Sequence, residues 1–209
     1  MDTKLSTILK SVCKLATPSN AGSGVFISPN RILTTQHNIS SALAVYADLE
    51  GVKEIRHPVY CDVFDLTGSK NYLSTIIAYD TAKDIALLEL KDHKVKDYSK
   101  IISEKEIENC NIFDDLYIIG AGADHDPLPT NGILTYKKEK VGYEFHWMTN
   151  APITTGDSGG GVFKKIKNTY YLIGIITSMG IDSDSNQIVH MTDFIPPLTL
   201  HEFLEKANG

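Results

Sequence analysis

Short runs rich in valine, isoleucine, tyrosine and threonine recur along most of this chain. Turn-forming stretches such as Ser-Pro-Asn, Asn-Gly and Lys-Asn separate the runs, a pattern typical of β-strands. The predicted strands in the first half are 24–28, 31–35, 43–48, 55–65, 72–79 and 84–90. Those in the second half are 116–120, 132–137, 143–149, 160–164, 170–178 and 188–193. About six strands in each half predict an all-β fold of two six-stranded antiparallel β-barrels.

Helical spacing marks both ends of the chain. Leu5, Ile8, Leu9 and Val12 recur at this spacing and predict a short N-terminal helix over 3–11. We expect its apolar side to pack against the protein core, because the stripe is too short and has too few lysines for a membrane anchor.

A second helix is predicted over 198–206, after two consecutive prolines. Its buried stripe comprises Leu200, Phe203 and Leu204. The stretch 91–112 is charged and less periodic, which is typical of a connection between two barrels.

These patterns divide the chain into two parts. We expect an N-terminal barrel over 1–98, a linker over 99–112, and a C-terminal barrel with its terminal helix over 113–209.

Composition narrows the class of protein. The 209 residues are 42% hydrophobic and carry 26 acidic against 20 basic side chains, a formal charge of −6. Arg31 and Arg56 are the two arginines. Because phosphate recognition relies on arginine and lysine patches, we expect no nucleic-acid partner.

Cysteine usage and the N-terminal sequence bear on location. Cys13, Cys61 and Cys110 are odd in number and widely spaced, so they predict neither a metal site nor a disulfide framework, and we expect no cofactor. The first residues lack the apolar run of a signal peptide, and no stretch is long enough to cross a membrane. The sequence therefore predicts a cytoplasmic protein without a membrane partner.

Residues 156–160 read Gly-Asp-Ser-Gly-Gly. A serine between glycines can be a nucleophile, because small neighbours let a substrate carbonyl approach and leave backbone N–H groups for an oxyanion. The same letters match the nucleophile elbow of an α/β-hydrolase-type esterase. That alternative is disfavoured, because glycines start a helix poorly and few residues remain downstream for an acid and a histidine.

The order of three segments instead resembles a chymotrypsin-fold, trypsin-like serine protease, closest to the protease domain of HtrA-type enzymes. His37 precedes Asp84 by 47 residues, and Asp84 precedes Ser158 by 74. The segments that carry the resemblance are Gly-Ser-Gly-Val-Phe-Ile-Ser at 22–28, Arg-Ile-Leu-Thr-Thr-Gln-His at 31–37, Asp-Thr-Ala-Lys-Asp-Ile-Ala-Leu-Leu at 80–88, Leu-Tyr-Ile-Ile-Gly at 116–120, Thr-Asn-Gly-Ile-Leu at 130–134, Thr-Asn-Ala-Pro-Ile-Thr-Thr-Gly-Asp-Ser-Gly-Gly at 149–160 and Leu-Ile-Gly-Ile-Ile-Thr-Ser-Met-Gly at 172–180.

The resemblance implies a serine endopeptidase that acts on protein or peptide substrates. A serine hydroxyl is a weak nucleophile, so His37 would take its proton and Asp84 would orient the imidazole. The backbone N–H groups of Gly156 and Ser158 would form the oxyanion hole.

The resemblance also places a substrate pocket. Pro152 would lie at its base with Ile153 beside it. Met179 would line a wall, Gly180 would leave the entrance open, and Ser178 would belong to the strand that binds the substrate backbone. Without an acidic residue at the base, small or medium aliphatic side chains are favoured before the cleaved bond (the P1 position). His190 keeps an acidic P1 residue open as the alternative.

The chain also departs from the family. Asp157 occupies the position that pairs with a freed Ile or Val amino terminus in zymogen-derived enzymes, yet no such start is present. Asp157 therefore either binds local N–H groups, which we favour, or leaves the loop poorly ordered until an activating partner protein binds. Asn38 follows His37 directly, and we expect no PDZ domain. Oligomeric state is not predicted, and a catalytically impaired, protease-fold binding module remains the second hypothesis.

Overall fold

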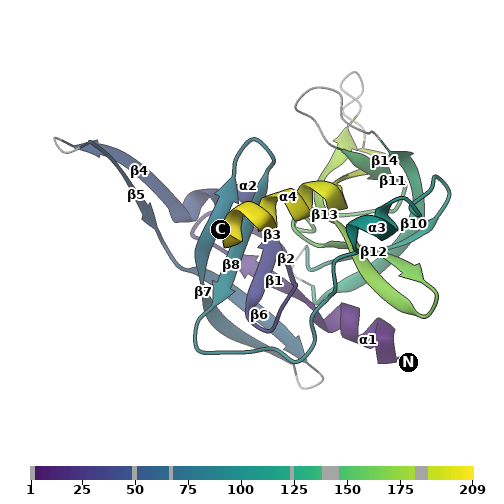
Figure 1. Ribbon diagram of the computed structural model, residues 1–209. Coiled ribbons are helices and arrows are strands. Elements are labelled where there is room, and N and C mark those ends of the chain that lie inside the picture. The colour runs from purple at the N-terminus through teal and green to yellow at the C-terminus, as the bar shows by residue number, and fades with distance from the viewer. Residues whose placement is uncertain (1–2, 49–50, 66–67, 123–124, 138–145, 182–187) are drawn as a thin grey trace.

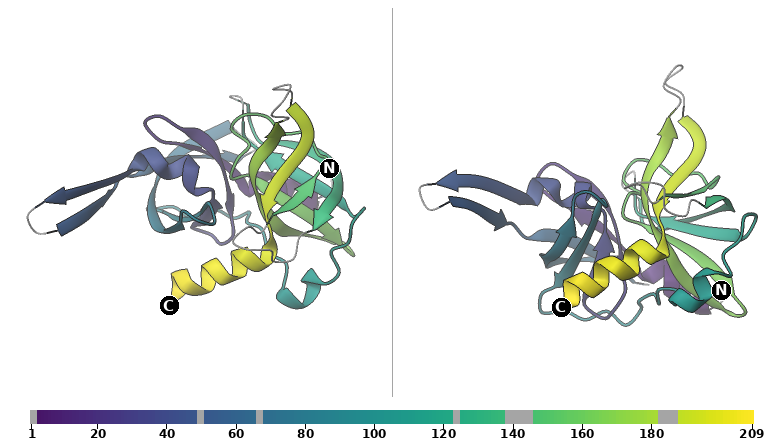
Figure 2. Two further views of the ribbon diagram at one scale, coloured as in Figure 1. Left: turned by 90° about the horizontal axis from the view of Figure 1, so that it is seen from above. Right: turned by 45° about the horizontal axis from the view of Figure 1, so that its top comes forward.

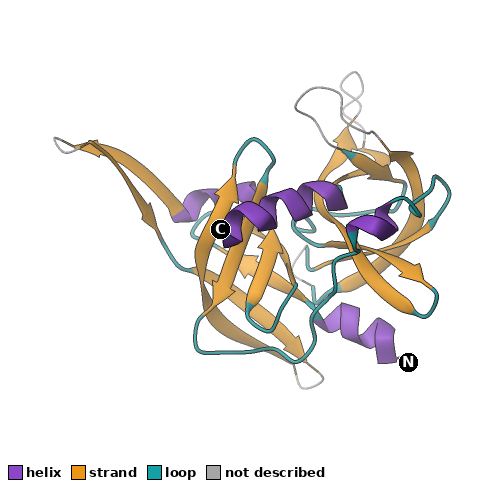
Figure 3. Ribbon diagram, viewed as in Figure 1, coloured by secondary structure: helices purple, strands orange, loops and turns teal. Residues whose placement is uncertain are grey.

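Two closed antiparallel β-barrels of six strands each form the body of the molecule (Figure 1, Figure 3). The computed structural model describes residues 3–48, 51–65, 68–122, 125–137, 146–181 and 188–209. The all-β, two-barrel fold predicted from the strand pattern is confirmed, as are the helices at the two ends.

The first barrel closes in the order β1-β2-β3-β8-β7-β6. Its strands are β1 (Val12–Ala16), β2 (Ala21–Phe26), β3 (Arg31–Thr34), β6 (Val59–Asp65), β7 (Gly68–Asp80) and β8 (Ile85–Leu90).

The second barrel closes in the order β10-β11-β14-β13-β12-β9. Its strands are β9 (Asp115–Gly120), β10 (Leu128–Lys137), β11 (Trp147–Thr149), β12 (Gly161–Ile166), β13 (Thr169–Ile181) and β14 (Ile188–Ile195).

One predicted barrel strand lies outside both barrels. The stretch 43–48 is β4 (Leu43–Asp48), which pairs only with β5 (Gly51–Arg56) in a two-stranded hairpin that projects away from the first barrel (Figure 2). Val45 and Val52 on this hairpin are 65% and 76% exposed. The composition of 43–48 therefore predicts a strand correctly but gives no information about what that strand packs against.

Two further differences from the sequence prediction concern a strand that is divided and a strand that was missed. The stretch 55–65 is divided between β5 and β6 at His57-Pro58, because proline cannot donate to a strand ladder. The strand β1 was missed, because Val12 also fits the helical spacing of the residues before it. In the structure Val12 instead pairs with Val25 of β2.

Short helices accompany the barrels. They are α1 (Thr3–Lys10), α2 (Gln36–Ile39) with the 3-10 turn η1 (Ser40–Ala42), α3 (Glu104–Ile107) and α4 (Pro197–Asn208). Both Leu200 and Phe203 of α4 are buried and Leu204 packs against the same core, which confirms the predicted stripe.

Three apolar clusters fill the molecule. One lies inside the first barrel around Phe26 and Leu88, and one inside the second around Leu116 and Phe194. The third lies between the barrels and combines residues of both with α1 and α4; its buried members are Ile8, Val12, Val25, Leu33, Ile85, Leu87, Ile119, Phe163, Tyr170, Leu172, Ile175, Ile195, Leu200 and Phe203. The relative position of the barrels therefore depends on a continuous hydrophobic interface.

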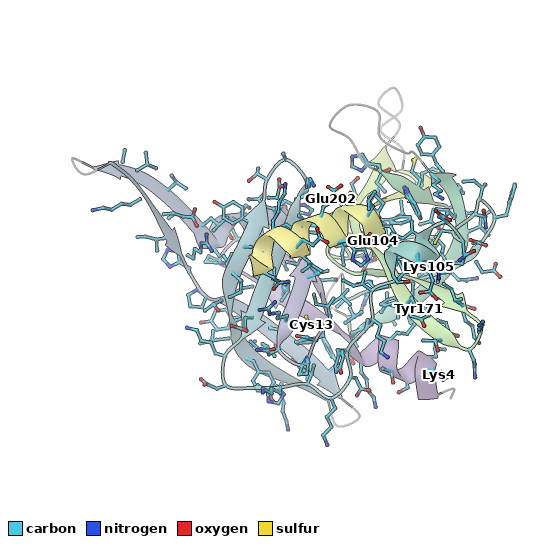
Figure 4. The ribbon with its side chains drawn as sticks, viewed as in Figure 1. Lys4, Cys13, Glu104, Lys105, Tyr171 and Glu202 are labelled. Atoms are coloured by element: carbon cyan, nitrogen blue, oxygen red, sulfur yellow. The ribbon has the colours of Figure 1, made fainter. Side chains whose placement is uncertain are left out.

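Polar contacts of the linker and of α4 reinforce this interface. The linker N–H of Ile102 donates to Leu172 O of β13, and its Ser99 N–H donates to Phe26 O of β2. The helix α4 leaves the second barrel and crosses to the first, where its Glu202 (labelled in Figure 4) binds Lys83 with an N–O distance of 2.8 Å.

All three cysteines are free and buried. Cys13 (Figure 4) and Cys61 share the core of the first barrel. Burial, reinforced by the nearby Cys61, raises the pKa of the Cys13 thiol well above its usual value, and burial also raises the pKa of Cys110. A raised pKa lowers the fraction of reactive thiolate at neutral pH.

We therefore expect the native thiols to resist alkylation. Iodoacetamide should modify them about 100-fold more slowly in buffer than in denaturant, because burial blocks access to all three thiols and the raised pKa of Cys13 and of Cys110 also suppresses their thiolates. Time-resolved mass spectrometry measures the rates, with Ser69→Cys at the exposed start of β7 as the reactive control. Rapid modification of Cys13 or Cys61 in the folded protein would contradict the described packing.

Candidate active site

His37 and Asp84 form a two-point contact on the first barrel. The Asp84 Oδ2 atom lies 2.8 Å from His37 Nδ1, and Asp84 Oδ1 accepts from the His37 backbone N–H at 2.9 Å. His37 sits in α2, directly after β3, and its side chain is 47% exposed. Both oxygens of one carboxylate thus fix the backbone and the ring of the same histidine. The other ring nitrogen, Nε2, points away from the carboxylate and lies 3.4 Å from Thr35 Oγ1, a long contact.

The carboxylate is aimed by the turn between β7 and β8. Asp84 has a φ of +51°, a left-handed conformation that aspartate tolerates better than most residues. The turn is held by the Lys83 N–H, which donates to Asp80 Oδ1 at 3.0 Å. The Lys83–Glu202 ion pair ties it to α4.

Ser158 comes from the second barrel and faces the same open pocket as His37. The pocket is lined from the first barrel by Ser19, Asn20, Ala21, His37, Asn38 and Ser40, and from the second by Thr155, Gly156 and Ser158. Ser158 Oγ donates to Thr177 O of β13 at 2.9 Å, and among the described contacts no hydrogen bond joins it to His37. Ser158 therefore lines the same pocket as His37, but its hydroxyl is hydrogen-bonded to the Thr177 carbonyl.

Backbone hydrogen bonds within the loop at 156–160, and from the loop to β13, hold its conformation. Gly159 N–H donates to Ile176 O at 2.7 Å and Gly160 N–H donates to Asp157 O at 2.8 Å. Gly159 has a φ of +86°, and a Cβ there would lie 2.0 Å from Ser23 O, so only glycine fits. Within the described residues, the N–H groups of Gly156 and Ser158 have no acceptor, which leaves both free for a ligand.

Asp157 is satisfied inside the protein. It is 7% exposed, and its Oδ1 accepts from Gly122 N–H at 3.0 Å while Oδ2 accepts from Thr154 N–H at 2.7 Å. Such charge-assisted bonds offset the cost of burying a carboxylate. The sequence left two alternatives for Asp157, bonds to local N–H groups or a poorly ordered loop. The structure has the bonds to local N–H groups.

The predicted pocket residues meet around β14. Thr192 of that strand pairs with Met179 in register and donates to Ala151 O at 2.7 Å, next to Pro152. Pro152 is exposed, whereas Ile153 packs against the second-barrel core. Ser178 is exposed, and Met179 and Gly180 are half-buried. The backbone of His190 belongs to β14, but its side chain lies outside the described residues.

Sequence reasoning missed several residues at this site. Ser23 and Asn38 hold the backbone of the Ser158 loop from the first barrel, and the Thr177 carbonyl accepts a hydrogen bond from the Ser158 hydroxyl. Gly122 supplies an N–H to Asp157. An asparagine next to a histidine was the one available signal, and it was noted only as a departure.

A comparison with protein-family models shows the family to which this chain belongs. The model described as "trypsin-like peptidase domain" matches residues 22–175, a range that contains His37, Asp84 and Ser158. This chain belongs to the trypsin-like peptidases. The fold of this trypsin-like peptidase, with a β-strand after Ser158 and two antiparallel barrels, also overturns the α/β-hydrolase alternative.

Solved structures share the fold. The inactive form of the Rv3671c protease matches with a TM-score of 0.73 and 16% identity, over 100% of this chain and 94% of that one. A serine-to-alanine mutant of Rv3671c from M. tuberculosis, also an inactive form, matches with a TM-score of 0.72 and 16% identity, over 99% and 91%. No curated protein matches the sequence.

The described residues were also compared with the requirements of a metal site and of a membrane-spanning helix. No described part of the chain gathers three or more histidine, cysteine or acidic side chains in a geometry that could hold a metal ion. No helix among the described residues is long and apolar enough to cross a membrane.

Removing the Asp157 carboxylate should destabilise the loop. Asp157→Ala leaves the N–H groups of Gly122 and Thr154 without acceptors, and we expect the free energy of unfolding to fall by about 2 kcal/mol. Urea denaturation followed by tryptophan fluorescence measures it. The exposed Asp126→Ala serves as the matched control, expected within about 0.5 kcal/mol of the starting protein. Equal stability of the two variants would show that the bonds to Asp157 contribute little.

Proposed function

We propose that this protein is a serine endopeptidase in which His37, Asp84 and Ser158 act together through an acyl-enzyme. The observation that carries the proposal is the two-point bond from Asp84 to His37. It fixes the imidazole through Nδ1 in the same pocket as Ser158, and Nε2 makes a long 3.4 Å contact with Thr35 Oγ1 that a serine hydroxyl would replace during catalysis. Membership of the trypsin-like peptidases supports it.

The proposed chemistry begins with a rotation of the Ser158 side chain. Leaving Thr177 O, the hydroxyl would give its proton to His37 Nε2 as Oγ attacks the peptide carbonyl carbon. The carbonyl oxygen, now negative, would be stabilised by the N–H groups of Gly156 and Ser158. His37 would then protonate the departing amine as the C–N bond breaks. Water, activated by the same histidine, would hydrolyse the acyl-enzyme and regenerate the serine.

A small or medium aliphatic P1 residue is the proposed preference. Pro152 and Ile153 present no charge where the family has its pocket base. Ser178 Oγ donates to Asp193 Oδ2 at 3.3 Å, so a negative charge lies beside the candidate pocket wall. That charge disfavours the acidic P1 alternative by repulsion.

One observation favours a second hypothesis, a protease-fold binding module with impaired catalysis. The bond between Ser158 and Thr177 keeps the hydroxyl from His37 in the described structure. A serine held there permanently would leave the pocket able to bind a peptide without cleaving it.

Reaction with a fluorophosphonate probe distinguishes the two hypotheses. We expect stoichiometric labelling of the native protein, located by mass spectrometry on the peptide that contains Ser158, together with cleavage of a casein substrate. Ser158→Ala should lose both signals while keeping its melting temperature. The exposed Ser69→Ala is the control and should keep both. A native protein that folds but neither reacts nor cleaves would favour the binding module; labelling that persists in Ser158→Ala would refute the assignment of the nucleophile.

Cleavage of a proteome-derived peptide library should reveal aliphatic P1 residues. In Pro152→Asp we expect cleavage after lysine or arginine to appear, because a carboxylate at the pocket base would attract a cationic side chain. Pro18→Asp makes the same change at another exposed proline and should leave the profile unchanged. A strong preference for lysine or arginine in the native protein would contradict the proposed pocket.

A further inference from the structure

A buried polar cluster on the first barrel holds the loop that carries Ser158. Its members are Ser23 of β2, Thr34 of β3 and Asn38 of α2, all buried. Two of them converge on a single acceptor: Ser23 N–H donates to Ser158 O at 2.8 Å, and Asn38 Nδ2 donates to the same oxygen at 2.7 Å. The backbone of the nucleophile candidate is therefore bonded to the barrel that carries His37.

The surroundings of Asn38 require an amide. Its Nδ2 atom faces Ser158 O at 2.7 Å, Thr34 Oγ1 at 3.2 Å and Ser23 O at 3.4 Å. The Thr34 hydroxyl already donates to Ser23 O at 2.7 Å, so it can only accept from Asn38. Three oxygen neighbours with no proton to offer demand a donor with more than one hydrogen, which an –NH₂ group supplies and a carboxylate does not.

Two glycines let this amide reach the backbone. A Cβ at Gly22 would lie 2.3 Å from the side-chain amide of Asn38, and a Cβ at Gly159 would lie 2.8 Å from its Nδ2. Any side chain at either position would displace Asn38. The close approach on both sides shows that the contact is part of the packing of the loop.

Three consecutive carbonyls of the loop are held as a result. Gly156 O accepts from Ser23 Oγ at 2.8 Å, Asp157 O accepts from Gly160 N–H, and Ser158 O accepts from Ser23 and Asn38. Because a peptide unit is planar and trans, fixing the Asp157 carbonyl points the Ser158 N–H to the opposite side. The flanking carbonyl bonds prevent that peptide unit from rotating.

We propose that Asn38 is a positioning residue that keeps the Gly156–Ser158 loop in its oxyanion-binding conformation, so that activity needs neither a freed amino terminus nor an activating partner. This inference rests on the proposed function and deepens it. Because both Asp157 oxygens are already bound to the N–H groups of Gly122 and Thr154, this carboxylate needs no freed amino terminus, and the first barrel supplies the further bonds that order the loop.

The test uses Asn38→Asp, which has nearly the same shape but places an acceptor against three oxygens. We expect kcat on a peptide substrate to fall by about 30-fold or more with KM within about threefold, as when an oxyanion donor is misplaced. The affinity of a reversible trifluoromethyl ketone should fall in parallel, because it depends on the oxyanion site. Affinity for a product peptide should not change. Asn168→Asp, in the exposed turn between β12 and β13, is the control for the added charge.

The pH dependence provides a second readout. Among oxygen neighbours the introduced carboxyl should have a raised pKa, since only its protonated form can donate to them. The ratio of the variant's kcat to that of the native protein should therefore rise as the pH falls. A constant ratio, or a loss of kcat no larger than in Asn168→Asp, would overturn the role of Asn38.

Two measurements keep the inference separate from the proposed function. Hydrogen–deuterium exchange of residues 156–160 should accelerate in Asn38→Asp and, if that variant does not fold, in Asn38→Ala, with or without catalysis. Unchanged exchange there would refute the positioning role. Native protein with an extended N-terminus should give linear progress curves from time zero; a lag, or activity only after N-terminal cleavage, would refute activation-free ordering. A native protein without any hydrolysis or labelling refutes the proposed function instead.

Discussion

The apolar contact between the two barrels is the constraint on which the candidate site depends. Asp84 and His37 are fixed within the first barrel, and Ser158 within the second, so no local interaction in either barrel can set the distance between them. That distance is set by the shared cluster in which Val25 and Leu87 of one barrel meet Phe163 and Ile175 of the other. Burial of several large apolar side chains is worth many times the energy of any single polar contact across the cleft.

The hydrophobic interface sets the approximate position of the two barrels, and polar contacts between them then fix the orientation of the Ser158 loop. Non-directional burial can place two surfaces together to within the size of a side chain, whereas an oxyanion site requires N–H groups to point in defined directions. The bonds from Ser23 and Asn38 to the Ser158 loop supply this direction. The terminal helix contributes at longer range, because Glu202 reaches Lys83 beside the Asp84 turn. The site is thus braced on both sides by contacts that cross between barrels.

The sequence alone sufficed for the fold class, for the strand pattern and for the order of His37, Asp84 and Ser158. These features are local or depend on residue type and spacing. It could not show that 43–48 leaves the barrel, because a solvent-exposed strand and a barrel strand have similar composition. Nor could it show the partners of Asp157, since Gly122 lies 35 residues away in the chain. The contacts of Asn38 could not be predicted either, because its three oxygen neighbours come from β2, β3 and the Ser158 loop, which are separate in the sequence.

The β4–β5 hairpin has a consequence for how this architecture can vary among related chains. Val45 and Val52 belong to none of the three apolar clusters, so folding places almost no demand on the outer half of the hairpin. Substitutions, deletions or longer inserts there change neither barrel closure nor the interface. The hairpin nevertheless begins only a few residues after His37. Sequence change in this segment therefore costs little stability, although the segment stays covalently close to His37. New binding properties can evolve there without any change to the two barrels.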